Sequence, residues 1–204
     1  MEFLSLTSLE ETLEKLESFG ADAAMVAGGT AIRYQLVSGQ IKAKTVLHIE
    51  RLGKAQGISC NGVTRLGALT NLRDIAENAK ILKHFPSVAQ AAGKCGGWQT
   101  QSVATVGGNV CGAAPNADLV PPLLVQDAEV ELTSRARGSQ SASIRSATRP
   151  IRPSKASTSR TKVPLAKPPI AGLHDISPMV SSLCVTSRVS APRRAATPAA
   201  SQPA

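Results

Sequence analysis

Two glycine-rich segments with the same order of residue types place the strongest constraint on how this 204-residue chain can fold. In both, a short run of small or β-branched residues precedes a pair of glycines and a polar residue. The segments are AMVAGGTAIRYQL, from residue 24, and SVATVGGNVCGAAPNADL, from residue 102. Adjacent glycines in this setting indicate positive φ, or a backbone that approaches another group too closely for a Cβ. We therefore expect two tight loops.

The same two loops indicate an anionic ligand. Neither has the spacing G-x-G-x-x-G, so a Rossmann dinucleotide site is not indicated. Glycine amides and helix N-termini can bind phosphate without a basic side chain. Two loops of this kind predict two cradles of backbone amides that face one ligand, and a cofactor with a diphosphate is the leading candidate.

The N-terminal part of the sequence predicts a β-α-β unit. Ser8 and Glu11 have the spacing of a capping box at the start of an amphipathic helix, and Gly20 can end that helix. Strands are expected at 23–26 and within 44–52, where Val46, Leu47 and Ile49 supply the apolar side chains, and a helix is expected at 31–37 between them. A parallel pair of strands follows from this order.

The next part predicts a second lobe of mixed structure. The pair Asn61-Gly62 lies between short alternating runs and favours a β-hairpin. Helices are expected at 71–78, 86–94 and 119–125, and a strand at 128–132. Trp98 is expected to anchor the core, and the alternative is that it borders a bound cofactor. The fold class is therefore α+β, with a first lobe over 1–53 and a second over 54–133.

The composition changes sharply near residue 134. Up to that residue there are 11 Lys and Arg against 13 Asp and Glu, and afterwards there are 12 against 1. All five aromatic residues lie before the change, and nine of the 13 prolines lie after it. Such a composition buries too little apolar surface to offset the entropy of ordering, so 134–204 is expected to be a disordered basic tail rich in Ser, Pro, Arg and Ala.

The cysteines and the N-terminal sequence argue against a metal-binding, disulfide-rich or membrane protein. The four cysteines are widely spaced and include no C-x-x-C pair, so neither a metal centre nor a disulfide framework is expected. Cys95 and Cys111 flank the second glycine pair without a base partner, and we expect no reactive-thiol chemistry. The acidic N-terminus and the lack of a long apolar run favour a cytoplasmic protein without a membrane partner.

Three collinear motifs resemble one known family. The segments AGGT, GALTNLRDI and GWQTQSVATVGGNVCGAAPNADLVPPLLVQDAEVEL are together similar to the FAD-binding medium subunit of molybdenum hydroxylases, the family of xanthine dehydrogenase and aerobic carbon monoxide dehydrogenase. The resemblance covers roughly 3–132. It implies a two-lobed FAD-binding domain of the PCMH type, in which a β-α-β lobe and an antiparallel-sheet lobe hold FAD between them.

The resemblance also implies a set of cofactor-binding residues and no catalytic side chain or metal ligand. The first loop contributes Met25, Val26, Ala27, Gly28, Gly29, Thr30 and Ala31, whose amides would hold the FAD diphosphate. The second loop contributes Thr105, Val106, Gly107, Gly108 and Asn109. Asp118 would accept a hydrogen bond from an FAD hydroxyl. The alternative for Thr30 and Asp118 is a role as helix N-caps.

The implied function is electron transfer between partner chains and an external acceptor. The molybdopterin and the iron-sulfur clusters would lie on a large and a small partner subunit. Because the resemblance stops within the second lobe, the tail is interpreted as a product of a frameshift, and an inactive truncated fragment is an alternative. A basic-tailed nucleic-acid-associated protein is another, although specific nucleic-acid binding is not expected because the tail lacks aromatic residues.

Overall fold

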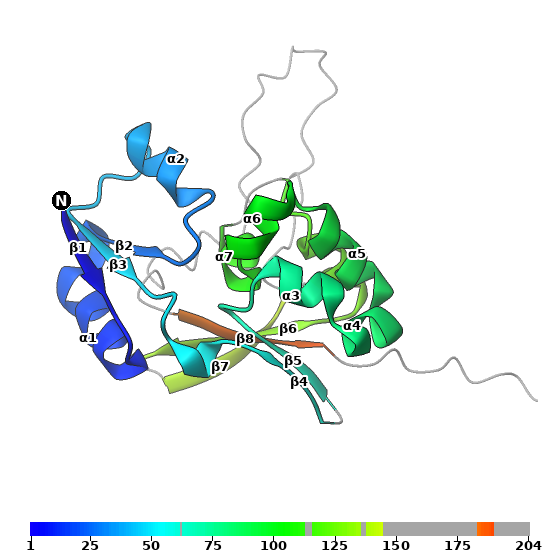
Figure 1. Ribbon diagram of the computed structural model, residues 1–204. Helices are drawn as coiled ribbons and strands as arrows, with labels where there is room; N and C mark the ends of the chain where they lie inside the picture. Colours follow the sequence, from blue (N-terminus) through cyan, green and yellow to red (C-terminus); the bar gives the residue numbers. More distant parts are fainter. Residues whose placement is uncertain (62, 113–115, 136–137, 145–182, 190–204) are drawn as a thin grey trace, which may run out of the picture.

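Two β-sheets, one parallel and one antiparallel, form the centres of two lobes in the computed structural model (Figure 1). The structure describes residues 1–61, 63–112, 116–135, 138–144 and 183–189. The first sheet ends at His48 and the second begins at Ile58. This arrangement confirms the predicted α+β class and its two lobes.

The first lobe is a three-stranded parallel sheet with one long helix packed on it. Its strands are β1 (Glu2–Ser5), β2 (Ala23–Val26) and β3 (Thr45–His48), in the order β1-β3-β2. Helix α1 (Leu9–Phe19) begins at the predicted cap, where the Ser8 hydroxyl oxygen accepts a hydrogen bond from the amide of Glu11. Leu16 of this helix is buried against Leu47 of the central strand. The 3-10 turn Gly20–Asp22 leads into β2.

The second lobe is a five-stranded antiparallel sheet covered on one face by helices (Figure 1). The strand order is β4-β5-β8-β6-β7. The strands are β4 (Ile58–Asn61), β5 (Val63–Gly67), β6 (Glu129–Ser134), β7 (Gly138–Ser143) and β8 (Leu183–Val189). The helices are α3 (Leu72–Glu77), α4 (Ala79–His84), α5 (Pro86–Lys94), α6 (Trp98–Val103), α7 (Val106–Cys111) and α8 (Val120–Val125). Their buried apolar side chains form the largest core of the chain.

The hairpin and the connections between the lobes follow local sequence signals. Strands β4 and β5 pair antiparallel as expected, although Gly62 at their turn lies outside the described residues. The 3-10 turn η2 (Gly53–Ala55) joins the lobes. There Leu52 and Ala55 pack with Leu69 of the second lobe in a small interlobe core. This core fixes the two sheets to each other.

Two strands differ from the expectation that residues 134–204 are a disordered tail. Strand β7 pairs with β6, and β8 lies between β5 and β6 in the sheet. Ile144 is 1% exposed and belongs to the main core. Pairing of backbone groups drives these strands onto the open edges of β5 and β6, whatever the average composition of the segment. The rest of the expected tail, 145–182 and 190–204, lies outside the described residues.

Several other elements were not predicted from the sequence. They are strand β1 and helices α4 and α6, of which α4 is capped by the Asn78 side chain. The second glycine pair lies inside helix α7, not in an open loop as expected. Thr105 caps α7 by accepting a hydrogen bond from the Gly108 amide at 3.1 Å, and so turns the glycine segment into a helical turn.

Candidate functional site

A cavity of about 520 Å³ lies between the two lobes and receives both glycine segments. Met25, Ile49 and the first glycine loop line it from the first lobe. Ala68, Leu69 and helix α7 line it from the second lobe. The volume is within the range of about 300–1,000 Å³ that is usual for small-molecule and cofactor sites.

The first glycine loop presents unused amides to this cavity. Strand β2 ends at Val26, and Gly29 adopts a φ of 71° before helix α2 (Ile32–Val37) begins. Within the described part of the chain, the amides of Gly28, Gly29, Thr30 and Ala31 donate no hydrogen bond. Helix α2 uses the carbonyl oxygens of Gly29 and Ala31 as acceptors. The loop therefore has free donors, which is the arrangement expected for an anion site.

The second glycine segment has its amides occupied. The amide of Val106 donates to the Thr70 carbonyl at 3.0 Å, and that of Gly107 donates to the Ala68 carbonyl at 2.8 Å. The amides of Gly108 and Asn109 donate to the hydroxyl and the carbonyl of Thr105. The expectation of two amide cradles is thus wrong for this segment, because Thr105 and the chain following β5 supply acceptors for its amides.

The two glycine segments approach each other through Gly28. A Cβ built on Gly28 would lie 1.7 Å from the carbonyl oxygen of Val103, at the end of α6. No side chain fits at that separation, so a glycine is required there. This contact brings the first loop directly beside the residues that precede α7.

Eleven of the thirteen predicted site residues line the cavity. They are Met25, Ala27, Gly28, Gly29, Thr30, Ala31, Thr105, Gly107, Gly108, Asn109 and Asp118. Val26 lies in β2 and does not line the cavity, and Val106 is 1% exposed in the main core. Both residues therefore lie behind the cavity wall. Neighbouring side chains point in different directions in a strand and in a helix, so the residues beside them line the cavity and they do not.

Asp118 and Thr30 do not act as helix caps. Helix α8 follows Leu119 and helix α2 follows Ala31, and neither helix has a side-chain cap. Asp118 is instead exposed and lines the cavity, as does Cys95. Burial raises the pKa of Cys95 to about 11, and the Asp118 carboxylate contributes to the rise. A raised pKa disfavours the thiolate of Cys95, in line with the expectation of no reactive-thiol chemistry at that residue.

The cavity wall has more members than the motifs indicated. Gln35 of α2, Thr100 of α6 and Asn116 add polar groups, and Ile49 and Leu69 add apolar surface. Sequence patterns could not single these residues out, because their position depends on how the lobes pack. Among the described lining residues there is no Lys or Arg, and Asp118 is the one carboxylate. An anionic ligand here would rely on backbone donors.

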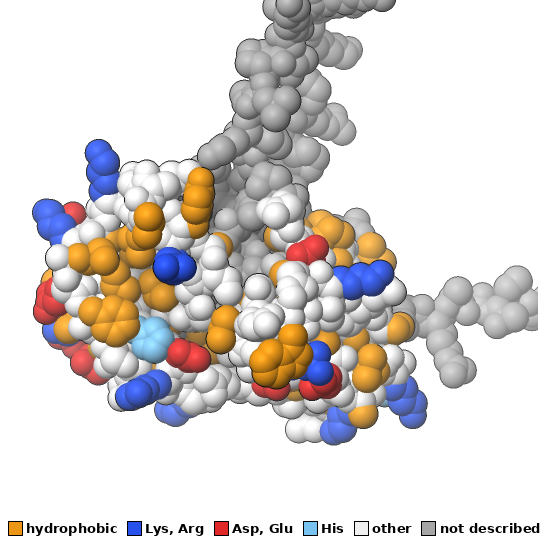
Figure 2. Space-filling model, turned by 45° about the horizontal axis from the view of Figure 1, so that its top comes forward, with side chains coloured by type: hydrophobic (Ala, Val, Ile, Leu, Met, Phe, Trp, Pro, Cys, Tyr) orange, Lys and Arg blue, Asp and Glu red, His pale blue; other side chains and the backbone are white. Residues whose placement is uncertain are grey.

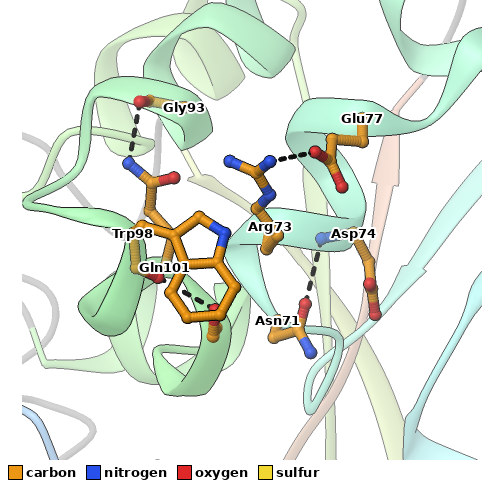
Figure 3. Close-up of polar contacts among 8 residues, drawn as sticks. Asn71, Arg73, Asp74, Glu77, Gly93, Trp98 and Gln101 are labelled. Carbon is orange, nitrogen blue, oxygen red and sulfur yellow. Dashed lines mark hydrogen bonds and ion pairs between the residues drawn. The ribbon is translucent and has the colours of Figure 1, made fainter.

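Trp98 corrects the expectation of a core anchor. Its side chain is 61% exposed at the start of α6 and does not line the cavity. Figure 3 shows Gln101 of the same helix pointing back toward Gly93. The Gln101 amide nitrogen donates to the Gly93 carbonyl at 2.8 Å and to the Gly96 carbonyl at 3.2 Å. A buried polar side chain therefore anchors α6 where an aromatic one was expected.

Three other features would indicate other kinds of site in the described residues: a basic surface patch, a metal site and a membrane-spanning helix. On the face drawn in Figure 2, Lys and Arg side chains are dispersed among acidic ones, and the described part forms no single basic patch there. The described residues contain no group of His, Cys, Asp and Glu side chains that could hold a metal ion. Within the same residues, no helix has the length and apolar character needed to cross a membrane.

Comparison with known proteins gives consistent matches. The family model for the FAD binding domain in molybdopterin dehydrogenase matches residues 1–148. The xanthine dehydrogenase FAD-binding subunit of Escherichia coli O157:H7 is 33% identical over 114 residues, which are 55% of this chain and 39% of that protein. The nicotinate dehydrogenase FAD-subunit of Eubacterium barkeri is 28% identical over 135 residues, 65% of this chain and 46% of that protein. This chain thus spans less than half of the length of the curated relatives that it matches.

Solved structures show the same fold. The cyanide-inactivated Cu,Mo-CO dehydrogenase superposes with a TM-score of 0.75 at 16% identity, over 95% of this chain and 60% of that one. A carbon monoxide dehydrogenase from Hydrogenophaga pseudoflava gives a TM-score of 0.76 at 19% identity, with the same coverage. At such identities the likeness concerns the fold alone.

Proposed function

The chain belongs to the family of FAD binding domains in molybdopterin dehydrogenases, and from this premise we propose that it is the FAD-carrying electron-transfer subunit of a molybdenum-containing hydroxylase or dehydrogenase. FAD would lie in the interlobe cavity. When bound, it supplies the hydride and one-electron chemistry that protein side chains lack. The chain itself binds, orients and shields the cofactor, and it needs no nucleophile or general base of its own.

The free amides of Gly28, Gly29, Thr30 and Ala31 are the observation that carries this proposal. They face a cavity whose described wall has no cationic side chain, so they are its main donors for a diphosphate. A phosphate group can be held by such donors together with the positive end of nearby peptide dipoles. Met25 and Ala27 complete this wall, with Val26 behind them.

The second segment has a different role in the proposed site. Gly107 and Gly108 keep the wall thin, and Thr105, Val106 and Asn109 hold it in place through hydrogen bonds and core packing. The Asp118 carboxylate supplies an acceptor for a hydroxyl of the ribose or the ribityl chain. In the proposed site, the first-lobe wall thus supplies donors for phosphate, and the second-lobe wall supplies an acceptor for hydroxyl groups.

The proposed partners are a molybdopterin-binding large subunit and an iron-sulfur small subunit. The described residues of this chain offer no cluster of metal-ligating side chains, so those centres would lie on other chains. Electrons would arrive from the iron-sulfur clusters and leave to an external acceptor. The compartment proposed for this assembly is the cytoplasm.

Reconstitution of the full 204-residue chain with flavin tests the proposal. We expect FAD to remain bound through gel filtration and FMN to be lost, because only FAD carries the diphosphate and the adenosine ribose. The flavin absorbance of the protein peak is the readout. Equal retention of the two flavins, or no retention of FAD even with partner subunits present, would contradict the proposal.

Replacement of Asp118 by Ala tests its role as an acceptor. Hydrogen bonds to a charged group contribute about 1.5–3 kcal/mol, so FAD affinity should fall by roughly one to two orders of magnitude. Titration calorimetry gives the affinity, and circular dichroism checks the fold. Asp74→Ala is the matched control, because Asp74 lies on α3 and does not line the cavity. An unchanged FAD affinity in the Asp118 variant would remove this residue from the site.

A further inference from the structure

The segment 29–43, which joins β2 to β3, has no polar contact with the rest of the described chain between its two ends. Before it, Gly28 packs so closely against the carbonyl oxygen of Val103 that a Cβ would lie 1.7 Å from that atom. After it, the Lys44 amide donates to the Asp22 carbonyl at 2.9 Å. Between these points, no hydrogen bond or ion pair joins 29–43 to another described segment.

Helix α2 in this segment lacks the packing that fixes a short helix. It has no buried residue and no side-chain cap. Helix α4 has the same length, but the Asn78 side chain caps it and Ile81 anchors it at 1% exposure. Isolated helices shorter than about 12 residues are marginal in water, so helices of this length depend on packing. Figure 1 shows α2 standing clear of both sheets. Of the two helices, α2 is therefore the less firmly held.

One side of α2 faces the cavity without a partner. Ile32 and Gln35 are half-buried and line the cavity. Within the described part of the chain, the side-chain amide of Gln35 makes no hydrogen bond. Tyr34 and Val37 of the same helix are 70% and 82% exposed. A ligand in the cavity would give α2 the apolar contact and the hydrogen-bond partner that the chain does not supply.

Glycines with positive φ stand on both sides of α2. The φ angles are 71° at Gly29 and 70° at Gly39, a region that glycine adopts without strain. A Cβ on Gly39 would meet no atom within 4 Å, so the backbone conformation, not packing, favours glycine there. The segment thus has a turn at each end where the chain can change direction.

From these observations we propose that residues 29–43 are a hinged lid, loosely held in the cofactor-free chain, which closes when α2 packs on the bound cofactor. Ile32 and Gln35 are its contacts. The free amides of Gly29, Thr30 and Ala31 belong to the same segment, so closure carries them onto the ligand. Closure of this kind shields a site from water and slows release. The inference rests on the proposed function in one respect, because it takes the ligand to be FAD.

Backbone deuterium exchange of the full 204-residue chain, followed by mass spectrometry, tests the lid. Exchange rates report how often a segment opens locally. In the cofactor-free chain, we expect α2 to exchange about tenfold faster than α4 after correction for intrinsic rates. Saturating FAD should slow the exchange of α2 by about tenfold and change that of α4 little, because only α2 gains packing from the ligand.

Gly39→Ala tests the hinge, with Gly20→Ala as the matched control. Gly20 also has a positive φ and open space at its Cβ position, but it ends α1, outside the lid. Both variants should lose stability, since alanine is strained at positive φ. Alanine at position 39 also redirects the chain after α2, so FAD should dissociate about five- to tenfold faster from Gly39→Ala only. Flavin fluorescence after dilution gives the rate.

Gln35→Ala tests the contact that the lid makes. We expect FAD to dissociate about two- to tenfold faster, the range of one neutral hydrogen bond. Gln40→Ala is the control within the lid, because Gln40 is exposed and does not line the cavity. It should release FAD at the wild-type rate.

The outcomes are separable. Exchange of α2 as slow as that of α4 in the cofactor-free chain overturns the proposal, and so does an α2 rate that FAD leaves unchanged. A wild-type FAD dissociation rate in Gly39→Ala overturns the hinge. If Gly39→Ala does not fold, the exchange rates and Gln35→Ala decide. If the wild-type chain retains no FAD, the proposed function fails, and the cofactor-free rates of α2 and α4 still decide whether the segment is loosely held.

Discussion

The two glycine pairs have similar sequences and opposite hydrogen-bonding states. Gly28 and Gly29 belong to a loop whose amides are free, whereas the amides of Gly107 and Gly108 are occupied within the chain. Part of the difference comes from neighbours that are distant in sequence: the carbonyls of Ala68 and Thr70 accept from α7, whereas in the described part of the chain no carbonyl accepts from the amides of Gly28 and Gly29. A Gly-Gly pair therefore indicates close approach of the backbone, and it indicates an anion cradle only where no acceptor competes.

Gly28→Ala is expected to have the largest effect on this comparison. The new Cβ would lie 1.7 Å from the Val103 carbonyl oxygen, so the loop or the end of α6 must move. We expect loss of bound FAD and a fall of about 3 kcal/mol in the free energy of unfolding, at the upper end of overpacking costs. Urea unfolding and flavin retention are the measurements. Gly53→Ala is the control, because its Cβ would meet no atom within 4 Å.

Gly107→Ala should be less severe and should affect stability more than binding. Its Cβ would lie 2.7 Å from the Ala68 carbonyl oxygen, so α7 must shift away from the end of β5. We expect a loss of about 1–3 kcal/mol in the free energy of unfolding. Because the Gly107 amide is already occupied, FAD affinity of the folded fraction should fall less than in Gly28→Ala. A larger fall would show that the second segment contributes donors after all.

Thr105→Val would release one amide of the second segment. The variant removes the hydroxyl that accepts from the Gly108 amide, so the start of α7 loses its cap. A lost cap costs about 1 kcal/mol of stability, and Thr105→Ser should retain it. Thermal unfolding followed by circular dichroism gives the comparison. Equal melting temperatures in the valine and serine variants would mean that the cap does not stabilise α7.

A change to alkaline pH should have the smallest effect, a partial loss of stability through Cys95 on the second-lobe wall. The pKa of Cys95 rises from its ordinary value of 9.0 to about 11 on folding, mainly through burial. The protonated thiol therefore favours the folded state, fully below pH 9, and this contribution is lost as the pH rises toward 11. Urea unfolding at pH 8 and pH 10 should show a steeper loss for the wild type than for Cys95→Ala. Parallel pH dependences would contradict the assigned shift.

Local signals in the sequence determined much of this protein. The capping box at Ser8, the small apolar strand at 23–26 and the hairpin signal at Asn61 each depend on neighbours within a few residues, and each appears where expected. The motif order also singled out eleven of the residues that line the cavity. Hydrogen bonds and packing over such short separations are encoded in the segment itself, so they can be read without knowledge of the rest of the chain.

Only the tertiary structure decided which groups remain available at the site. The amides of Val106 and Gly107 in α7 are occupied by carbonyls more than thirty residues away, and β8 is placed by the open edges of β5 and β6 rather than by its composition. Likewise, Cys95 and Asp118 line the same cavity only because α5 and α8 pack in one core. A donor or an acceptor is free when no partner reaches it, and that condition depends on the packing of the whole chain, which no local pattern contains.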